Sequence, residues 1–124
     1  MEPVNAVVDT NILIDYLNGS PKAQRELNSF EKIHVSIVSW MEILVGATEG
    51  DEESEIREFL RRFEVHPVHE GIAERAVDIR RREKIRLPDA IIWATAQHLG
   101  FLLVTRNTRD FPRNDPGVRI PYRV

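Results

Sequence analysis

Residues 4–11 read Val-Asn-Ala-Val-Val-Asp-Thr-Asn, a short apolar run with β-branched residues that stops at an acid. A run of this length without polar alternation predicts a fully buried strand of a parallel sheet. We expect that strand over residues 4–8, ending at Asp9. No glycine-rich phosphate loop follows it, so a small-molecule or nucleotide-binding α/β domain is the least favoured interpretation.

Strand and helix patterns alternate along the rest of the chain. Further strands are expected at residues 34–38, 65–68, 101–104 and 118–120. Helices are expected at residues 12–17, from 21, from 39, and at 51–63, 70–84 and 88–99. The alternation predicts a single α/β domain over residues 1–124, with a parallel sheet of four to five strands between two layers of helices.

Composition narrows the classes of function. The chain has 124 residues, a net charge of −3 and no cysteine, which excludes disulfide frameworks, thiolate zinc sites and cysteine nucleophiles. The modest negative charge disfavours a protein that coats nucleic acid through charge alone. No apolar run approaches the roughly 20 residues of a membrane helix, and the N-terminus lacks the pattern of a signal peptide. We therefore expect a cytoplasmic protein.

Four carboxylates lie where a strand ends or a helix begins: Asp9, Glu42, Asp89 and Asp110. In parallel α/β sheets, functional sites form beyond the carboxyl ends of the strands. Mg²⁺ prefers oxygen ligands, and a bound divalent ion activates water and stabilises a leaving oxygen. The four acids are therefore candidates for one metal site.

Each of these acids also has an ordinary structural interpretation. Asp9 is suited to cap the following helix, Asp89 complements a helix dipole, and Asp110 is a common turn residue. Ser39 and Glu42 fit the S-x-x-E capping box, in which the glutamate bonds to the start of its own helix. Taken alone, the residues favour this capping role for Glu42.

Four stretches together resemble a known family. They are residues 8–17 (VDTNILIDYL), 39–46 (SWMEILVG), 87–96 (LPDAIIWATA) and 103–111 (LVTRNTRDF). In this order they resemble the motifs of PIN domains, specifically the VapC-type branch. The resemblance implies a PIN-like α/β/α fold and an endoribonuclease that holds Mg²⁺, or Mn²⁺ in its place, with carboxylates. Such proteins are usually toxins of toxin–antitoxin pairs and cut transfer or ribosomal RNA.

The resemblance also implies roles for individual residues. Asp9 and Asp89 are expected to bind the metal most directly, while Glu42 positions metal or water. Either Asp110 or Asn107 is expected to complete the site. The groups expected to orient these carboxylates are Thr10, Asn11, Thr105 and Asn107.

Arg106 and Arg109 flank the last motif and are the expected substrate-binding residues. The basic stretch over residues 80–86 is more ordinarily a solvated helix face. Asp15 is expected to face solvent or to lie at the edge of the packing. The four histidines show no ligand spacing and no set of partners, which indicates structural or surface positions: His34, His66, His69 and His98.

The resemblance further implies a small antitoxin partner and a homodimer. An apolar groove between the early helices is the expected antitoxin site, although a buried core position is the more ordinary interpretation of each candidate: Trp40, Leu44, Val45, Phe59 and Phe63. Two alternative functions remain open on sequence: a PIN-fold nuclease of RNA processing, and a noncatalytic module that binds RNA or protein.

Overall fold

A parallel sheet forms the centre of the molecule. The computed structural model describes residues 4–47, 50–112 and 114–123. Residues 1–3, which belong to the N-terminus considered above for a signal peptide, lie outside this set. Within the described residues, five strands form one sheet in the order β3-β2-β1-β4-β5, and all pairings are parallel. The strands are β1 (Asn5–Val8), β2 (Lys32–Ser36), β3 (Glu64–His66), β4 (Leu102–Val104) and β5 (Val118–Arg119).

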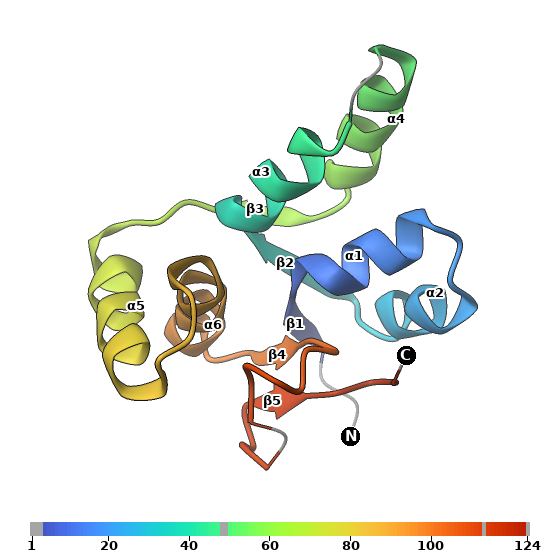
Figure 1. Ribbon diagram of the computed structural model, residues 1–124. Helices are drawn as coiled ribbons and strands as arrows, with labels where there is room; N and C mark the ends of the chain where they lie inside the picture. Colours follow the sequence, from blue (N-terminus) through green and yellow to red (C-terminus); the bar gives the residue numbers. More distant parts are fainter. Residues whose placement is uncertain (1–3, 48–49, 113, 124) are drawn as a thin grey trace.

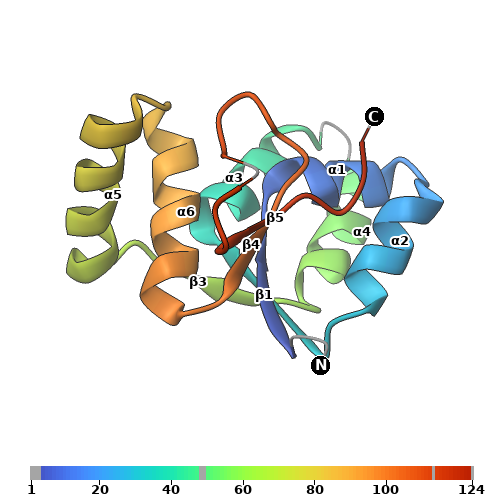
Figure 2. The same cartoon turned by 90° about the horizontal axis from the view of Figure 1, so that it is seen from below.

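Helices cover both faces of this sheet (Figures 1 and 2). On one face lie α5 (Glu70–Glu83) and α6 (Leu87–Leu99), and on the other lie α1 (Thr10–Leu17) and α2 (Pro21–Asn28). The remaining two, α3 (Ile37–Val45) and α4 (Gly50–Leu60), pack against each other. The three-layer α/β/α fold predicted from the alternating pattern is confirmed.

The side chains on the two faces of β1 pack into two separate hydrophobic cores, because successive side chains of a strand point to opposite sides. Val8 packs with residues of α1, α2 and α4, whereas Val7 packs with residues of α5 and α6. Both valines are fully buried. The unbroken apolar run that identified this strand is therefore a consequence of its central position.

Local signals account for most helix boundaries. The Ser20 side chain caps α2, whose first residue is Pro21, and Gly100 ends α6 with a φ of 75°. The strand predicted at residues 65–68 lies at 64–66 instead, before Pro67, which has no N–H for a ladder. That strand is at the edge of the sheet.

One boundary differs from the prediction in a way that matters for the site. The second strand ends at Ser36, and α3 begins at Ile37 rather than at Ser39. The Ser36 hydroxyl caps α3 by accepting from the Val38 N–H at 3.1 Å. The capping-box interpretation of Ser39 and Glu42 was therefore wrong, because Ser36 already fills the cap position.

The histidines do have partners, contrary to the prediction. His34 Nδ1 lies 2.8 Å from His66 Nε2, and its other ring nitrogen lies 3.0 Å from Asn5 Oδ1. The rings of His69 and His98 meet edge to face. Their roles are structural, in line with the rest of that prediction. In the part of the chain described here, every helix is too short or too polar to cross a membrane.

Candidate active site

The predicted acids gather at the carboxyl ends of β1 and β4. These two strands are neighbours in space but far apart in sequence, since the chain leaves β1 towards β2 and returns later to β4. Such a reversal of strand order opens a crevice where α/β proteins bind ligands. Val8 pairs with Val104, so that Asp9 and Thr105 emerge side by side from the sheet.

Asp9 lies at the centre of this crevice and is 4% exposed. Its Oδ1 accepts from the Thr10 N–H at 2.7 Å, which caps α1. Its Oδ2 accepts from the Thr105 hydroxyl at 2.7 Å and from the Asn11 amide at 3.3 Å. The capping interpretation of Asp9 is thus correct, and it leaves room for a second role. A carboxylate has about four acceptor positions, and these three donors leave one of them for a further ligand.

The electrostatic state of Asp9 sets it apart from an ordinary cap. Burial raises the pKa of its carboxyl to about 6. Hydrogen bonds from Thr105 and Thr10 lower this pKa, while the negative charges of Asp89 and Glu42 raise it. The result is a buried carboxylate that repels its acidic neighbours. A cation at this position would offset both the desolvation of the carboxylate and this repulsion.

Glu42 reaches the same place from α3. Its Oε1 lies 2.8 Å from the Thr10 hydroxyl oxygen, which is also 2.9 Å from the hydroxyl oxygen of the buried Ser39. Thr10 has a single hydroxyl proton, and the carboxylate is the stronger acceptor. Ser39 therefore donates to Thr10, and Thr10 donates to Glu42. Ser39 and Thr10 position this acid, although the sequence had suggested a cap.

Asp89 enters the crevice from the first turn of α6 and is 7% exposed. Burial raises the pKa of its carboxyl, although the positive charge of Arg86 and its hydrogen bond to Asp89 Oδ2 at 3.3 Å oppose the change. The negative charges of Asp110 and Glu42 act in the same direction as burial. Asp89 thus interacts electrostatically with Glu42 and Asp110, and Asp9 with Asp89 and Glu42.

The loop after β4 supplies the fourth acid and its support. Asn107 donates from its side-chain amide to Asp110 Oδ2 at 2.9 Å, and its carbonyl oxygen accepts from the Asp110 N–H at 3.2 Å. The Asn107 N–H also donates to the Thr105 hydroxyl at 3.1 Å. Asn107 thus holds Asp110 in place, and Asp110 carries the charge that acts on Asp89.

A groove of about 440 Å³ opens beside these acids and carries three arginines. Arg86 and Arg109 are exposed in it. Arg106 also lines it, but its guanidinium is bound by Asp15 through two hydrogen bonds of 2.6 and 3.0 Å. The Asp15 side chain is only 17% exposed. Of the two positions expected for Asp15, the solvent-facing one is therefore wrong, and the partly buried side chain fits the edge of the packing.

The chemistry of the donor set fits a hard divalent cation. Asp9, Glu42, Asp89 and Asp110 offer oxygen ligands only, which suits Mg²⁺ or Mn²⁺ and not a soft metal. Among the described residues, no three acidic or histidine side chains converge closely enough to hold an ion by themselves. Mg²⁺ does not require such a cage, because it keeps several waters and is often bound by one or two carboxylates.

Asp15, Tyr122 and Ser39 were missed or misassigned on sequence. Tyr122 donates to Asp15 Oδ2 at 2.8 Å, across 107 residues of chain. A pairing between such distant residues leaves no local pattern. For Ser39, a signal was available, since Ser36 three residues earlier is an equally good cap and its choice would have freed Ser39.

Comparisons with known proteins place this geometry in a family. The family model of the PIN domain matches residues 6–115. A relative named Ribonuclease VapC10 from Mycobacterium tuberculosis is 37% identical over 114 residues, covering 86% of this chain and 85% of that protein. A toxin-antitoxin complex from Klebsiella pneumoniae contains a chain that is 42% identical with a TM-score of 0.90, over 96% of this chain and 99% of that one. A DNA-bound VapBC structure from Salmonella typhimurium shares the fold, with 24% identity, a TM-score of 0.79 and coverage of 94% and 96%. The chain belongs to the PIN domain family.

Proposed function

We propose that this chain is a divalent-metal-dependent endoribonuclease and the toxin of a VapBC-type toxin–antitoxin pair, formed by a single PIN domain over residues 1–124 and acting in the cytoplasm. The observation that carries this proposal is the meeting of four acids at the reversal of strand order beside an arginine-lined groove. The relative named as a ribonuclease and the structure named as a toxin-antitoxin complex support it.

Asp9 and Asp89 are the residues that would hold Mg²⁺ or Mn²⁺, since both are buried and the charges of two other acids act on each of them. When bound, the ion supplies activation of water and charge stabilisation at the cleaved phosphodiester. Glu42 is oriented by Thr10, and Asp110 by Asn107. No histidine or serine nucleophile is needed.

The groove supplies the means of holding RNA. Arg86 and Arg109 are exposed, and Arg86 contacts Asp89 through Nε, so both residues offer donors to phosphate oxygens of the RNA backbone. The negative charge of the acids alone would repel a polyanion. The two arginines beside them offset that repulsion at the place where the scissile phosphate must lie.

An antitoxin has a suitable surface between α1, α3 and α4. A groove of about 480 Å³ is lined there by Ile14, Leu17, Ile43 and Ile56, with Glu42 at its border. Ile14 and Leu17 are 44% and 38% exposed. A partner seated in this groove would touch Glu42 and so block the site. Of the apolar candidates from the sequence, Phe59 and Phe63 belong to the core, whereas Val45 is 81% exposed.

The antitoxin and homodimer assignments have direct tests. Ile14→Glu should abolish co-purification with the protein encoded by an adjacent short reading frame, while Val77→Glu, a similarly exposed valine on α5, should not. Equal retention by both variants would reject the groove as the antitoxin site.

The homodimer is tested by light scattering after size exclusion, and a monomeric mass at micromolar concentration would reject it.

The test of the enzymatic function is cleavage by protein freed of any antitoxin. With Mn²⁺ present, wild type should cut transfer or ribosomal RNA, and chelation should stop it. Asp89→Asn should be inactive, whereas Asp78→Asn, which removes an exposed acid on α5, should cut normally. Absence of metal-dependent cleavage, or equal cleavage by both variants, would reject the nuclease in favour of a noncatalytic module.

A further inference from the structure

The C-terminal segment reaches back to the loop that carries the fourth acid. After β5 the chain runs towards α1 and α2 (Figures 1 and 2). There the Tyr122 hydroxyl donates to Asp15 Oδ2 at 2.8 Å. The same carboxylate accepts from Arg106 Nε at 2.6 Å and from Arg106 Nη2 at 3.0 Å. One acid on α1 thus joins the C-terminal segment to the loop after β4.

This cluster of three side chains is partly shielded from water. The side chains of Asp15 and Arg106 are 17% and 30% exposed. Burial raises the pKa of Asp15, but the hydrogen bonds from Arg106 and Tyr122 and the charge of Arg106 outweigh it, so that the pKa lies below its ordinary value. Burial and the neighbouring Asp15 raise the pKa of Tyr122, which keeps its hydroxyl protonated as a donor. The contact is therefore charge-assisted at neutral pH.

Arg106 transmits this contact to the metal-binding acids through its own backbone. Its N–H donates to Asn11 Oδ1 at 3.4 Å, and the Asn11 amide donates to Asp9 Oδ2 at 3.3 Å. The residue before it, Thr105, donates to the same Asp9 oxygen at 2.7 Å. A shift of Arg106 would move both donors of Asp9 Oδ2.

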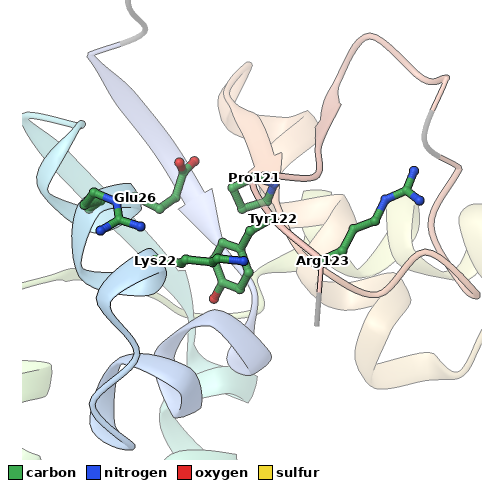
Figure 3. Close-up of a pocket in the computed structure, with 6 residues that line it drawn as sticks. Lys22, Glu26, Pro121, Tyr122 and Arg123 are labelled. Carbon is green, nitrogen blue, oxygen red and sulfur yellow. The ribbon is translucent and has the colours of Figure 1, made fainter.

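The segment is also anchored at a second point. Arg119 binds Glu26 of α2 through hydrogen bonds of 2.6 and 2.9 Å. Pro121 and Tyr122 then line a hollow of about 400 Å³ together with Lys22, Arg25 and Glu26 of α2 (Figure 3). The Tyr122 ring also packs against the core cluster that contains Ala23 and Leu27 of α2, which together with the Asp15 contact gives its hydroxyl a defined position.

We propose that Asp15 and Tyr122 are positioning residues of the active site, which fix Arg106 and through it the loop that carries Thr105 and Asp110. This inference rests on the proposed nuclease function. It also changes the role of Arg106, which the sequence had suggested as a substrate-binding residue. With its guanidinium bound by Asp15 on two atoms, Arg106 orients the loop, and phosphate binding falls to Arg86 and Arg109.

The experiment compares Tyr122→Phe and Asp15→Asn with a matched control. Tyr16→Phe removes the same hydroxyl from a tyrosine of α1 that bonds to Arg62 instead. The measurements are kcat and KM for RNA cleavage with Mn²⁺, and the Kd of Mn²⁺ by calorimetry without RNA, all below the melting temperature of each variant. Groups that orient metal ligands typically alter activity or metal affinity by roughly 10- to 100-fold. We expect roughly 10-fold losses in kcat and Mn²⁺ affinity for Asp15→Asn and smaller losses for Tyr122→Phe.

The KM for RNA should stay unchanged, because neither residue contacts the substrate. Arg106→Lys separates geometry from charge: lysine keeps the charge but cannot make the two-atom contact. We expect Arg106→Lys to lose kcat as Asp15→Asn does. A rise in KM with unchanged kcat would instead assign Arg106 to phosphate binding and overturn the proposal.

The same measurements separate the positioning role of Asp15 and Tyr122 from the nuclease function. If wild type cuts RNA and both variants match Tyr16→Phe in kcat and Mn²⁺ affinity, the nuclease stands and the positioning role is rejected. If wild type cuts no RNA, the nuclease is rejected, and the Mn²⁺ affinities alone decide the positioning role. Equal affinity in all proteins, or no binding by any, then overturns it as well.

Discussion

Asp9 and Asp15 lie six residues apart at the two ends of one short stretch, yet their environments have opposite effects. Burial and neighbouring acids raise the pKa of Asp9 to about 6. Hydrogen bonds from Arg106 and Tyr122 lower the pKa of Asp15 despite its burial. Asp9 has neutral donors and negative neighbours, whereas Asp15 has a guanidinium. Arg106 balances the charge of Asp15 within the chain, whereas the raised pKa of Asp9 supports its proposed role as the ligand of a cation from outside the chain.

Removing the charge of Asp9 should have the largest effect on activity. Asp9→Asn should reduce RNA cleavage by about 100-fold or more, since it removes a carboxylate that we propose as a metal ligand. The metal-free variant should melt at the same temperature as wild type or slightly higher, because a carboxylate that repels its neighbours is gone. Calorimetric Mn²⁺ binding and thermal melts on the same samples measure both effects. A melting temperature many degrees below wild type would mean that Asp9 is mainly a helix cap.

The pH dependence of stability gives the next largest effect. A carboxyl whose pKa is raised on folding favours the protonated protein, so its contribution is fully present below pH 3.8 and is lost as pH rises through about 6. The change from 3.8 to about 6 corresponds to about 3 kcal/mol. Without metal, wild type should lose that much relative to Asp9→Asn between pH 4 and pH 7, as measured by urea unfolding. Parallel curves for the two proteins would contradict it.

Removing the charge of Asp15 should have the opposite sign. Asp15→Asn leaves Arg106 partly buried without its anion, which we expect to cost about 2 kcal/mol at pH 7, below the figure for a fully buried pair. The folded-state pKa is lowered, so the contribution is present above about pH 4 and disappears as pH falls through the folded value. Urea unfolding of both proteins at pH 7 and pH 3 tests this. A cost that does not decrease between pH 7 and pH 3 would indicate lost packing, not lost charge.

The features of this molecule that could be predicted from the sequence are those set by residues close together in the chain. Asp9 was identified because a buried strand ends there, and Asp89 because a helix begins at Leu87 and Pro88. The sheet was predicted from the alternation of strand and helix patterns, each of which lies within a short stretch of sequence. Arg106 and Asp15 are 91 residues apart, and nothing within either stretch encodes their contact. The start of α3 was misplaced because Ser36 and Ser39 are equally good caps.

The smallest effect in the series concerns the Tyr122 hydroxyl, which belongs only to the Asp15 side of the comparison. Tyr122→Phe should cost about 1 kcal/mol at pH 7, somewhat less than a typical hydrogen bond to a charged group, because Arg106 still satisfies the carboxylate. In the Asp15→Asn background the same substitution should cost less, since the charge that strengthens the bond is absent. A double-mutant cycle by urea unfolding measures that coupling. If the two costs are simply additive, the Tyr122 hydroxyl does not act through the charge of Asp15.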